Sequence, residues 1–410
     1  MKKIAFISFI ASSVLMAGGY KIPETSTNAV ALGAANVAHN QNSADAAYYN
    51  PAKMVFMSDE NHVDADLTYI GLEKVKFNGT VYGTGPYDIE SENEDFFVPT
   101  LHYVSGALGD NGARIGLSIV SPGGLSKRWE DSIASYSAKE FTLKTIEVNP
   151  TAAFKVTDNM AFAAGIRFVR SSGVVTAVGV SPVIGSYYQD MTGTSVDVGF
   201  NLALEYNPLK ELEIGATYRS KVNLTLKGDA DLYSSTYGIN GNYAASVTVP
   251  LPAAVNLAVA YTFPTKTTFE FVYEKTYWSS YNSLDFQYTD PTAEAVFGVS
   301  KDKNWKDTNT FRFGITQNLN DLTLMAGLVI DESPVPSQTI GFELPDTDST
   351  SVSLGGRYKI NKQLDIGLSA LYSMHEDRTI SATDANENGI VGEFSDGNIL
   401  IISAGLGYKF

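Results

Sequence analysis

The 410-residue sequence contains no cysteine, and this absence excludes several classes of protein together. Without cysteine there is no disulfide scaffold, no cysteine-based zinc site and no cysteine nucleophile. Basic residues are also scarce, since 29 lysines and arginines stand against 45 acidic residues and the formal net charge is −16. A nucleic-acid partner is therefore not expected, because binding to phosphates needs a basic face.

Long hydrophobic runs are missing as well. No internal stretch reaches the roughly eighteen apolar residues that a membrane-spanning helix needs, which excludes a helical membrane protein. A mostly apolar stretch, residues 4–16, follows Lys2 and Lys3 and precedes a small-residue segment. This stretch is too short to span a membrane. This arrangement is typical of a secretory signal peptide, so we expect residues 1–17 to be removed on export.

The sequence is rich in alternation between apolar residues and small or polar ones. In residues 255–263 every odd position is apolar and every even position is small or polar, and residues 198–206 and 364–372 are similar. Helical spacing is not sustained anywhere after the signal segment. Because a period of two is that of a strand, the chain is predicted to be all-β.

Two all-β architectures give such alternation. A soluble sandwich or propeller turns its apolar face inward, whereas a membrane barrel turns it outward and fills its lumen with small and polar residues. Here the small or polar positions are rich in glycine and charge, aromatic residues lie at strand ends, and short polar links alternate with long ones at 78–95, 228–245 and 331–348. These features favour a multi-pass transmembrane antiparallel β-barrel in the outer membrane.

The carboxyl terminus gives a further indication of a barrel. Alternate residues from Leu400 to Tyr408 are apolar or small, and the sequence ends on Phe410. Gly405-x-x-Tyr408-x-Phe410 resembles the terminal signal by which the barrel insertion machinery recognises outer-membrane barrels. At about ten residues per strand plus a turn and a loop, residues 60–410 predict about fourteen strands, with twelve or sixteen as alternatives.

Residues 18–59 lack alternation and are expected to fold compactly inside the lumen as a hatch. Within them, Tyr20-Lys21-Ile22-Pro23-Glu24-Thr25-Ser26 and Asn50-Pro51-Ala52 resemble the hatch of the long-chain fatty-acid transporter family (FadL type), which includes aromatic hydrocarbon transporters. Later runs, Trp305-Lys306-Asp307 and Asp331-Glu332-Ser333-Pro334-Val335-Pro336, are similar to that family's carboxyl-terminal third. The resemblance therefore spans the mature chain, although its middle aligns loosely.

The resemblance implies a mechanism. In that family a hydrophobic ligand enters between external loops, reaches a pocket beside the hatch and leaves sideways at an inward kink of the third strand. In the resemblance, Ser121-Pro122-Gly123-Gly124 matches the position of the kink. Proline removes a ladder donor and glycine tolerates unusual dihedrals, so this run would break strand pairing; an ordinary loop is the alternative. We expect Asn50-Pro51-Ala52 to anchor the hatch there, with Asn50 bonding the backbone groups that the kink at Gly124 frees.

The resemblance also implies a ligand site. Lys306 matches a family lysine that binds the ligand's carboxylate, and Tyr20 matches the hatch aromatic residue of the same pocket. Val175 aligns loosely with a second basic residue of that site and cannot bind an anion. Alternation counted back from Phe311 places Lys306 in the lumen and Trp305 in the aromatic girdle, although Lys306 could equally be an ordinary lumen charge.

The leading hypothesis is passive uptake of long-chain fatty acids or similarly hydrophobic compounds by a monomeric barrel that is no enzyme and needs no cofactor. Its partners would be the hydrophobic ligand, outer-membrane lipid and lipopolysaccharide, and the insertion machinery. Transport of neutral aromatic hydrocarbons by the same route is the second hypothesis. A general porin or an adhesion barrel is the third.

No metal site is assigned. The four histidines are scattered and form neither a metal-ligand spacing nor a hydrolase pattern. Asp384-x-Asn386-x-Asn388-Gly389 resembles the first half of a calcium loop, but Ser395 stands where the acidic twelfth residue is expected. A solvated external loop is therefore preferred over a calcium site.

Overall fold

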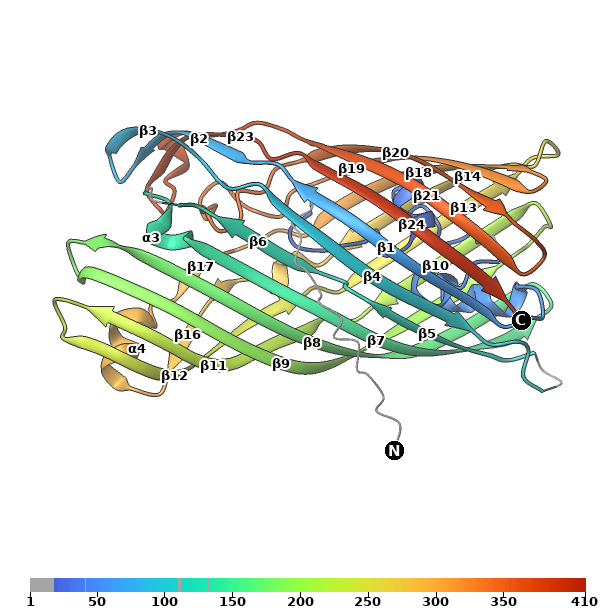
Figure 1. Ribbon diagram of the computed structural model, residues 1–410, viewed down its shortest axis with the longest axis horizontal. Helices are drawn as coiled ribbons and strands as arrows, with labels where there is room; N and C mark the ends of the chain where they lie inside the picture. The colour runs from blue at the N-terminus through green and yellow to red at the C-terminus, as the bar shows by residue number, and fades with distance from the viewer. Residues whose placement is uncertain (1–17, 41, 110–111, 131–132) are drawn as a thin grey trace.

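The computed structural model describes residues 18–40, 42–109, 112–130 and 133–410, so the predicted signal peptide lies outside the described residues. Fourteen antiparallel strands form a closed barrel (Figure 1). Around the wall they are β1 (His62–Leu72), β4 (Glu94–Val104), β5 (Arg114–Val120), β7 (Glu140–Thr157), β8 (Met160–Ser181), β9 (Gly185–Tyr206), β10 (Leu212–Arg219), β13 (Ala254–Thr262), β14 (Thr267–Thr276), β18 (Thr308–Leu319), β19 (Leu322–Asp331), β20 (Ser349–Lys359), β21 (Leu364–His375) and β24 (Ile399–Lys409). β24 pairs with β1 along its whole length, which closes the ring and confirms the predicted fold.

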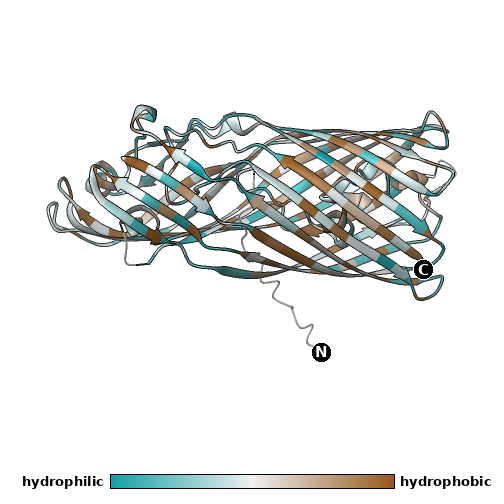
Figure 2. Ribbon diagram, turned by 90° about the horizontal axis from the view of Figure 1, so that it is seen from above, coloured by the Kyte–Doolittle hydropathy of each residue, from teal (hydrophilic) through white to brown (hydrophobic). Residues whose placement is uncertain are grey.

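The wall is apolar outside and polar inside. Outward-facing residues such as Val259, Phe313 and Leu354 expose 42%, 43% and 68% of their surface. Figure 2 shows hydrophobic residues as brown bands on the strands. Lipid tails can cover such a surface, and strands paired on both sides leave no backbone group for water to satisfy. No helix in the described residues is long and apolar enough to cross a membrane.

Several strands extend past the barrel at one end, which we call the long-loop end. β11 (Val222–Ser234) and β12 (Ile239–Leu251) form a hairpin on β9, and β16 (Phe286–Tyr288) pairs with β12. A separate sheet contains β2 (Val75–Val81), β3 (Thr84–Glu90), β22 (Arg378–Ile380) and β23 (Ile390–Asp396). The remaining elements are β6 (Gly124–Arg128), α3 (Ser135–Ala138), η2 (Trp278–Ser280), β15 (Ser283–Leu284), α4 (Pro291–Phe297), β17 (Lys301–Asp302) and η3 (Ala382–Asp384).

Two of the three predicted long links contain hairpins. Residues 78–95 and 228–245 fall largely within β2–β4 and β11–β12, whereas residues 332–348 are a true loop. All three are long connections between wall strands, but in the first two the chain continues as strands beyond the lipid-covered band. There the outer face no longer has to be apolar, so the alternation that marks a strand in the sequence disappears.

Residues 18–40 and 42–57 pack against the inner face of the barrel, drawn dark blue in Figure 1, and we call them the hatch. The hatch contains α1 (Thr27–Leu32), α2 (Ala46–Tyr49) and η1 (Pro51–Phe56). The Ser26 hydroxyl caps α1 by accepting a hydrogen bond from the Ala29 amide at 3.1 Å. Gly327 of β19 lets α1 approach the wall closely, because a Cβ there would lie 2.3 Å from the carbonyl carbon of Leu32.

Ion pairs fill the lumen around the hatch. Arg167 binds Glu147 at 2.9 Å, and Arg219 binds the other oxygen of the same carboxylate. Lys53 of the hatch binds Glu205 of β9 at 3.0 Å. Buried charges need such partners, since an unpaired one would cost several kcal/mol. The Lys53–Glu205 pair also fixes the hatch against the wall.

Candidate functional site

The strand pairing of the wall is incomplete beside β4. β4 pairs with β1 along its whole length, but it pairs with β5 only over residues 101–104, opposite residues 116–119. β6, which follows β5, pairs with β7. In the part of the chain that the structure describes, residues 94–100 of β4 therefore face β6 without a ladder between them. We call this unpaired boundary the seam.

A one-residue bulge produces the seam. Val120 pairs with Glu147 and Gly124 pairs with Lys144, so four steps along β5–β6 lie opposite three along β7. The extra residue turns β6 inward. The Ser126 hydroxyl of β6 consequently donates a hydrogen bond to the buried carboxylate of Glu94 in β4. The predicted kink at residues 121–124 is present, and its role in transport stays a prediction.

The first residues of the hatch pair with this kink. The Ile22 amide donates to the Pro122 carbonyl at 3.1 Å, and the Gly124 amide donates to the Tyr20 carbonyl at 2.9 Å. A Cβ on Gly123 would lie 2.8 Å from the Tyr20 carbonyl oxygen, so only glycine permits this approach. The hatch thus supplies part of the pairing that the neighbouring strand does not.

The prediction that Asn50 covers the kink is wrong. Its amide group donates to Glu205 of β9 at 2.8 Å, and its side-chain oxygen accepts from the Ala52 amide at 3.1 Å, where η1 starts with Pro51. Asn50-Pro51-Ala52 therefore anchors the hatch to β9. Residues 20–22 instead run extended along the kink and offer backbone groups directly, and the Thr145 hydroxyl bonds the amide and the carbonyl of Gly123.

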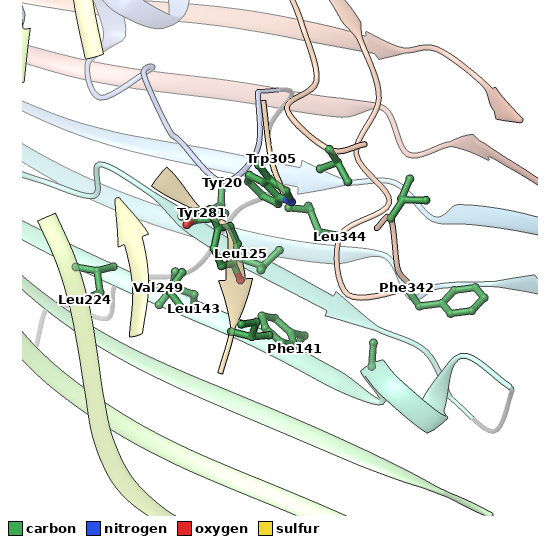
Figure 3. Close-up of a cluster of buried hydrophobic side chains, with 14 of the residues drawn as sticks. Tyr20, Leu125, Phe141, Leu143, Leu224, Val249, Tyr281, Trp305, Phe342 and Leu344 are labelled. Atoms are coloured by element: carbon green, nitrogen blue, oxygen red, sulfur yellow. The ribbon is translucent and has the colours of Figure 1, made fainter. Parts of the chain in front are cut away.

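An apolar pocket lies beside Tyr20 on the side of the long-loop end (Figure 3), with an empty volume of about 620 Å³. Tyr20 is 1% exposed, and its ring lies 4.7 Å from Trp278 and 5.6 Å from Trp305. The pocket brings together hatch, wall and loops. Its apolar lining includes Leu125, Leu143, Leu226, Val249, Tyr281 and Leu344.

The structure places two of the three predicted ligand residues on this pocket. Tyr20 and Val175 line it, but Lys306 is exposed and does not. Trp305, predicted for the aromatic girdle, is 5% exposed and lines the pocket. The predicted orientation of these two residues is wrong because β18 begins only at Thr308, and strand alternation does not extend into the loop before it.

Lys303 and Glu343 supply the charge in the pocket, and the sequence reasoning missed both. Lys303 is 4% exposed and its ammonium binds the Glu343 carboxylate. Burial alone would raise the pKa of Glu343, but the Lys303 ammonium outweighs burial and holds that pKa below its usual value. Lys303 stands three residues before the lysine chosen from the sequence, and no spacing links it to Glu343.

The pocket continues toward the long-loop end. A second cavity, with an empty volume of about 830 Å³, reaches α3 and α4. Together the two cavities form one route from the loops to Tyr20, which is apolar beside Tyr20 and mixed in polarity beside α3 and α4. The residues that line both are Phe141, Val175, Leu284, Phe286, Lys303 and Glu343.

A further cavity lies next to residues 21–23, and charged and apolar side chains are mixed in its lining. Its lining includes Lys21, Arg219 and Arg312 together with Pro122 of the kink, and its empty volume is about 660 Å³. The first residues of the hatch therefore lie between an apolar pocket and a cavity that also contains charged side chains. A hydrophobic solute that passed Tyr20 would meet these charged side chains.

The long loop 332–348 also contacts the start of the hatch. The Gly19 amide donates to Asp346 at 3.3 Å, and the Ser333 hydroxyl donates to the same oxygen at 2.7 Å. Burial raises the pKa of Asp346 to about 8, so this carboxyl group carries a proton at neutral pH.

The segment that resembles a calcium loop has a packing role. The side-chain amides of Asn386 and Asn388 each donate to the Ile340 carbonyl at 3.0 Å, which supports the loop 332–348. Within the described residues no group of three or more acidic or histidine side chains is placed to hold a metal ion.

A closed barrel with an apolar outer face, a plugged polar lumen and an internal apolar pocket is the architecture of an outer-membrane transport barrel. Residues 8–410 match a family model described as outer membrane protein transport protein (OMPP1/FadL/TodX), and the chain belongs to this family. It is a multi-pass protein of the outer membrane.

Known relatives agree in fold and in class. The long-chain fatty acid transport protein of Salmonella typhi is 27% identical over 358 residues, covering 79% of this chain and 80% of the relative. The crystal structure of a Pseudomonas aeruginosa FadL homologue matches with a TM-score of 0.82 at 22% identity, covering 96% of this chain and 100% of that one. The P. putida toluene transporter TodX matches with a TM-score of 0.72 at 17% identity, covering 95% and 99%.

Proposed function

We propose that this protein carries long-chain fatty acids or similarly hydrophobic compounds across the outer membrane passively, and that it releases them sideways through the seam. The observation that carries this proposal is that Tyr20 contacts both the pocket and the kink. Its ring lines the apolar pocket, and its carbonyl oxygen pairs with the kink at Gly124. A ligand that displaces Tyr20 from the pocket would therefore also release the kink.

The apolar lining of the pocket supports a sideways exit. A hydrophobic ligand gains free energy by staying out of water, at about 25 cal/mol per Å² of apolar surface. Straight passage beyond residues 20–22 would bring it into the charged cavity around Arg219 and Arg312. Release through the seam would instead bring it directly into the lipid that surrounds the wall.

The same arrangement supports a monomer, because one chain contains the pocket, the hatch and the seam. Outer-membrane lipid and lipopolysaccharide would surround the barrel, and the insertion machinery would recognise the strand that ends at Phe410. Relatives named for fatty acids and for toluene support both ligand classes as candidates. No step of this route calls for an enzymatic reaction or a cofactor.

Uptake by variants of the pocket wall tests the proposal. Val249 lines the pocket, and Thr248 is exposed on the other face of β12. In cells that lack their own transporters, Val249→Arg should abolish uptake of labelled palmitate and toluene, because it places a charge in the apolar pocket. Thr248→Arg is the matched control and should transport normally.

Two results would contradict the proposal. Undiminished uptake by a folded Val249→Arg variant would show that ligands do not use this pocket. Rapid swelling of liposomes in sugar solutions, with the intact protein in their membrane, would instead favour a general porin.

A further inference from the structure

We propose that Glu343 makes the pocket select uncharged hydrophobic ligands over carboxylates, because the Glu343 carboxylate already binds the Lys303 ammonium group in the pocket. This inference rests on the proposed function and specifies its ligand class. Among the described residues that line the pocket, Lys303 and Glu343 are the charged ones, and they bind each other. The remaining lining is apolar, aromatic or neutral.

Lys303 is held in place independently of any ligand. Its amide donates to the Asn282 carbonyl at 2.7 Å, and its carbonyl accepts a hydrogen bond from the Thr339 hydroxyl at 2.6 Å. The side chain is 5% exposed, so its ammonium has little water to bind. Under these conditions a lysine needs a fixed anionic partner, and Glu343 supplies it.

Glu343 is equally well fitted to this position. It lies over Gly341, where a Cβ would come within 2.2 Å of its Oε2 atom, so a residue with a side chain at 341 would push the carboxylate away. Lys301, which is exposed, lines the adjoining cavity but not the pocket itself. The pocket proper therefore contains one cation and one anion.

A fatty-acid carboxylate has no favourable place in such a pocket. If it bound beside Glu343, two carboxylates would share one ammonium in a poorly solvated space, and like charges so close disfavour each other. If it displaced Glu343, that carboxylate would lose its partner among apolar side chains. An uncharged ligand meets neither penalty, since it needs contact only with the aromatic and aliphatic lining.

Binding to the purified full-length protein tests this inference. Palmitate and hexadecanol are matched probes that differ in the charge of one end, and binding is measured at a pH where free palmitate is ionised. We expect the wild type to prefer hexadecanol. Glu343→Gln should strengthen palmitate binding about 10- to 100-fold, the range of one charge-assisted hydrogen bond, and change hexadecanol binding less than twofold.

Two further variants identify the cause. The gain for palmitate should disappear in Lys303→Met/Glu343→Gln, which has no charge in the pocket. Glu376→Gln removes an exposed carboxylate outside the pocket and should change neither affinity, which controls for net charge.

The outcomes separate the two proposals. Unchanged palmitate affinity in Glu343→Gln, with hexadecanol still bound, would overturn the selectivity inference and leave the proposed function intact. A gain that persists without Lys303 would also overturn it. If the wild type bound neither probe, the proposed function would fail and the inference with it.

Discussion

Deletion of Pro122 should close the seam and abolish uptake while the barrel still folds. The bulge contains one residue more than β7 requires, since Val120 pairs with Glu147 and Gly124 with Lys144. Removing a single residue therefore leaves the β6–β7 pairs unchanged and lets β5 and β6 form one regular strand. That strand would continue its existing ladder with β4, which now ends at Leu101 opposite Ile119.

The strand register gives the magnitude of the stabilisation expected when the seam closes. Residues 94–100 of β4 are seven positions without a partner on this side, and about one hydrogen bond per position would form on closure. The two backbone bonds between residues 20–22 and the kink would be lost. A net gain of about five bonds at roughly 0.5–1.5 kcal/mol each stabilises the closed wall by about 3–8 kcal/mol. Such a wall would stay closed.

The assay is uptake of labelled ligand by cells that produce equal amounts of folded barrel, with folding verified by unfolding in urea. Hydrogen exchange at the amides of residues 94–100 reports whether the ladder has formed. Pro122→Ala keeps the extra residue and should transport normally. If the deletion variant showed new protection at β4 and took up ligand at the wild-type rate, release through the seam would be refuted.

Three further outcomes are expected. Thr145→Val removes the hydroxyl that bonds both the amide and the carbonyl of Gly123, and should lower the free energy of unfolding by about 1–3 kcal/mol in urea titration; no change would mean that water replaces it. Trp305→Ala, which empties the space beside Tyr20, should weaken ligand binding at least tenfold in titration, and equal affinity would remove Trp305 from the site. The pKa of Asp346 lies near 8 in the folded protein, above its ordinary value, so the folded state binds the proton more tightly and stability falls as pH rises from about 4 to 8. Protease sensitivity of loop 332–348 should therefore increase over this range in the wild type and stay flat in Asp346→Asn.

The sequence alone determined the barrel. Period-two alternation, as in residues 255–263, places one face in lipid and the other in the lumen, and this requirement acts on every residue of a membrane-spanning strand. The length of the chain predicted the strand number, and the loss of alternation predicted the hatch. The kink position came from the family resemblance of residues 121–124, where a proline followed by glycines is consistent with a break in strand pairing.

The ligand site was decided by the tertiary structure. Alternation could not orient Trp305 and Lys306, because the strand starts only at Thr308 and a loop has no fixed period. Glu343 reaches Lys303 from a loop 40 residues away, and a contact at that separation leaves no local pattern in the sequence. The kink is covered by residues 20–22 because backbone groups pair with any extended segment that passes near them. Side-chain identity determines the faces of the strands, but only the folded chain determines which loop fills the lumen and which charges meet there.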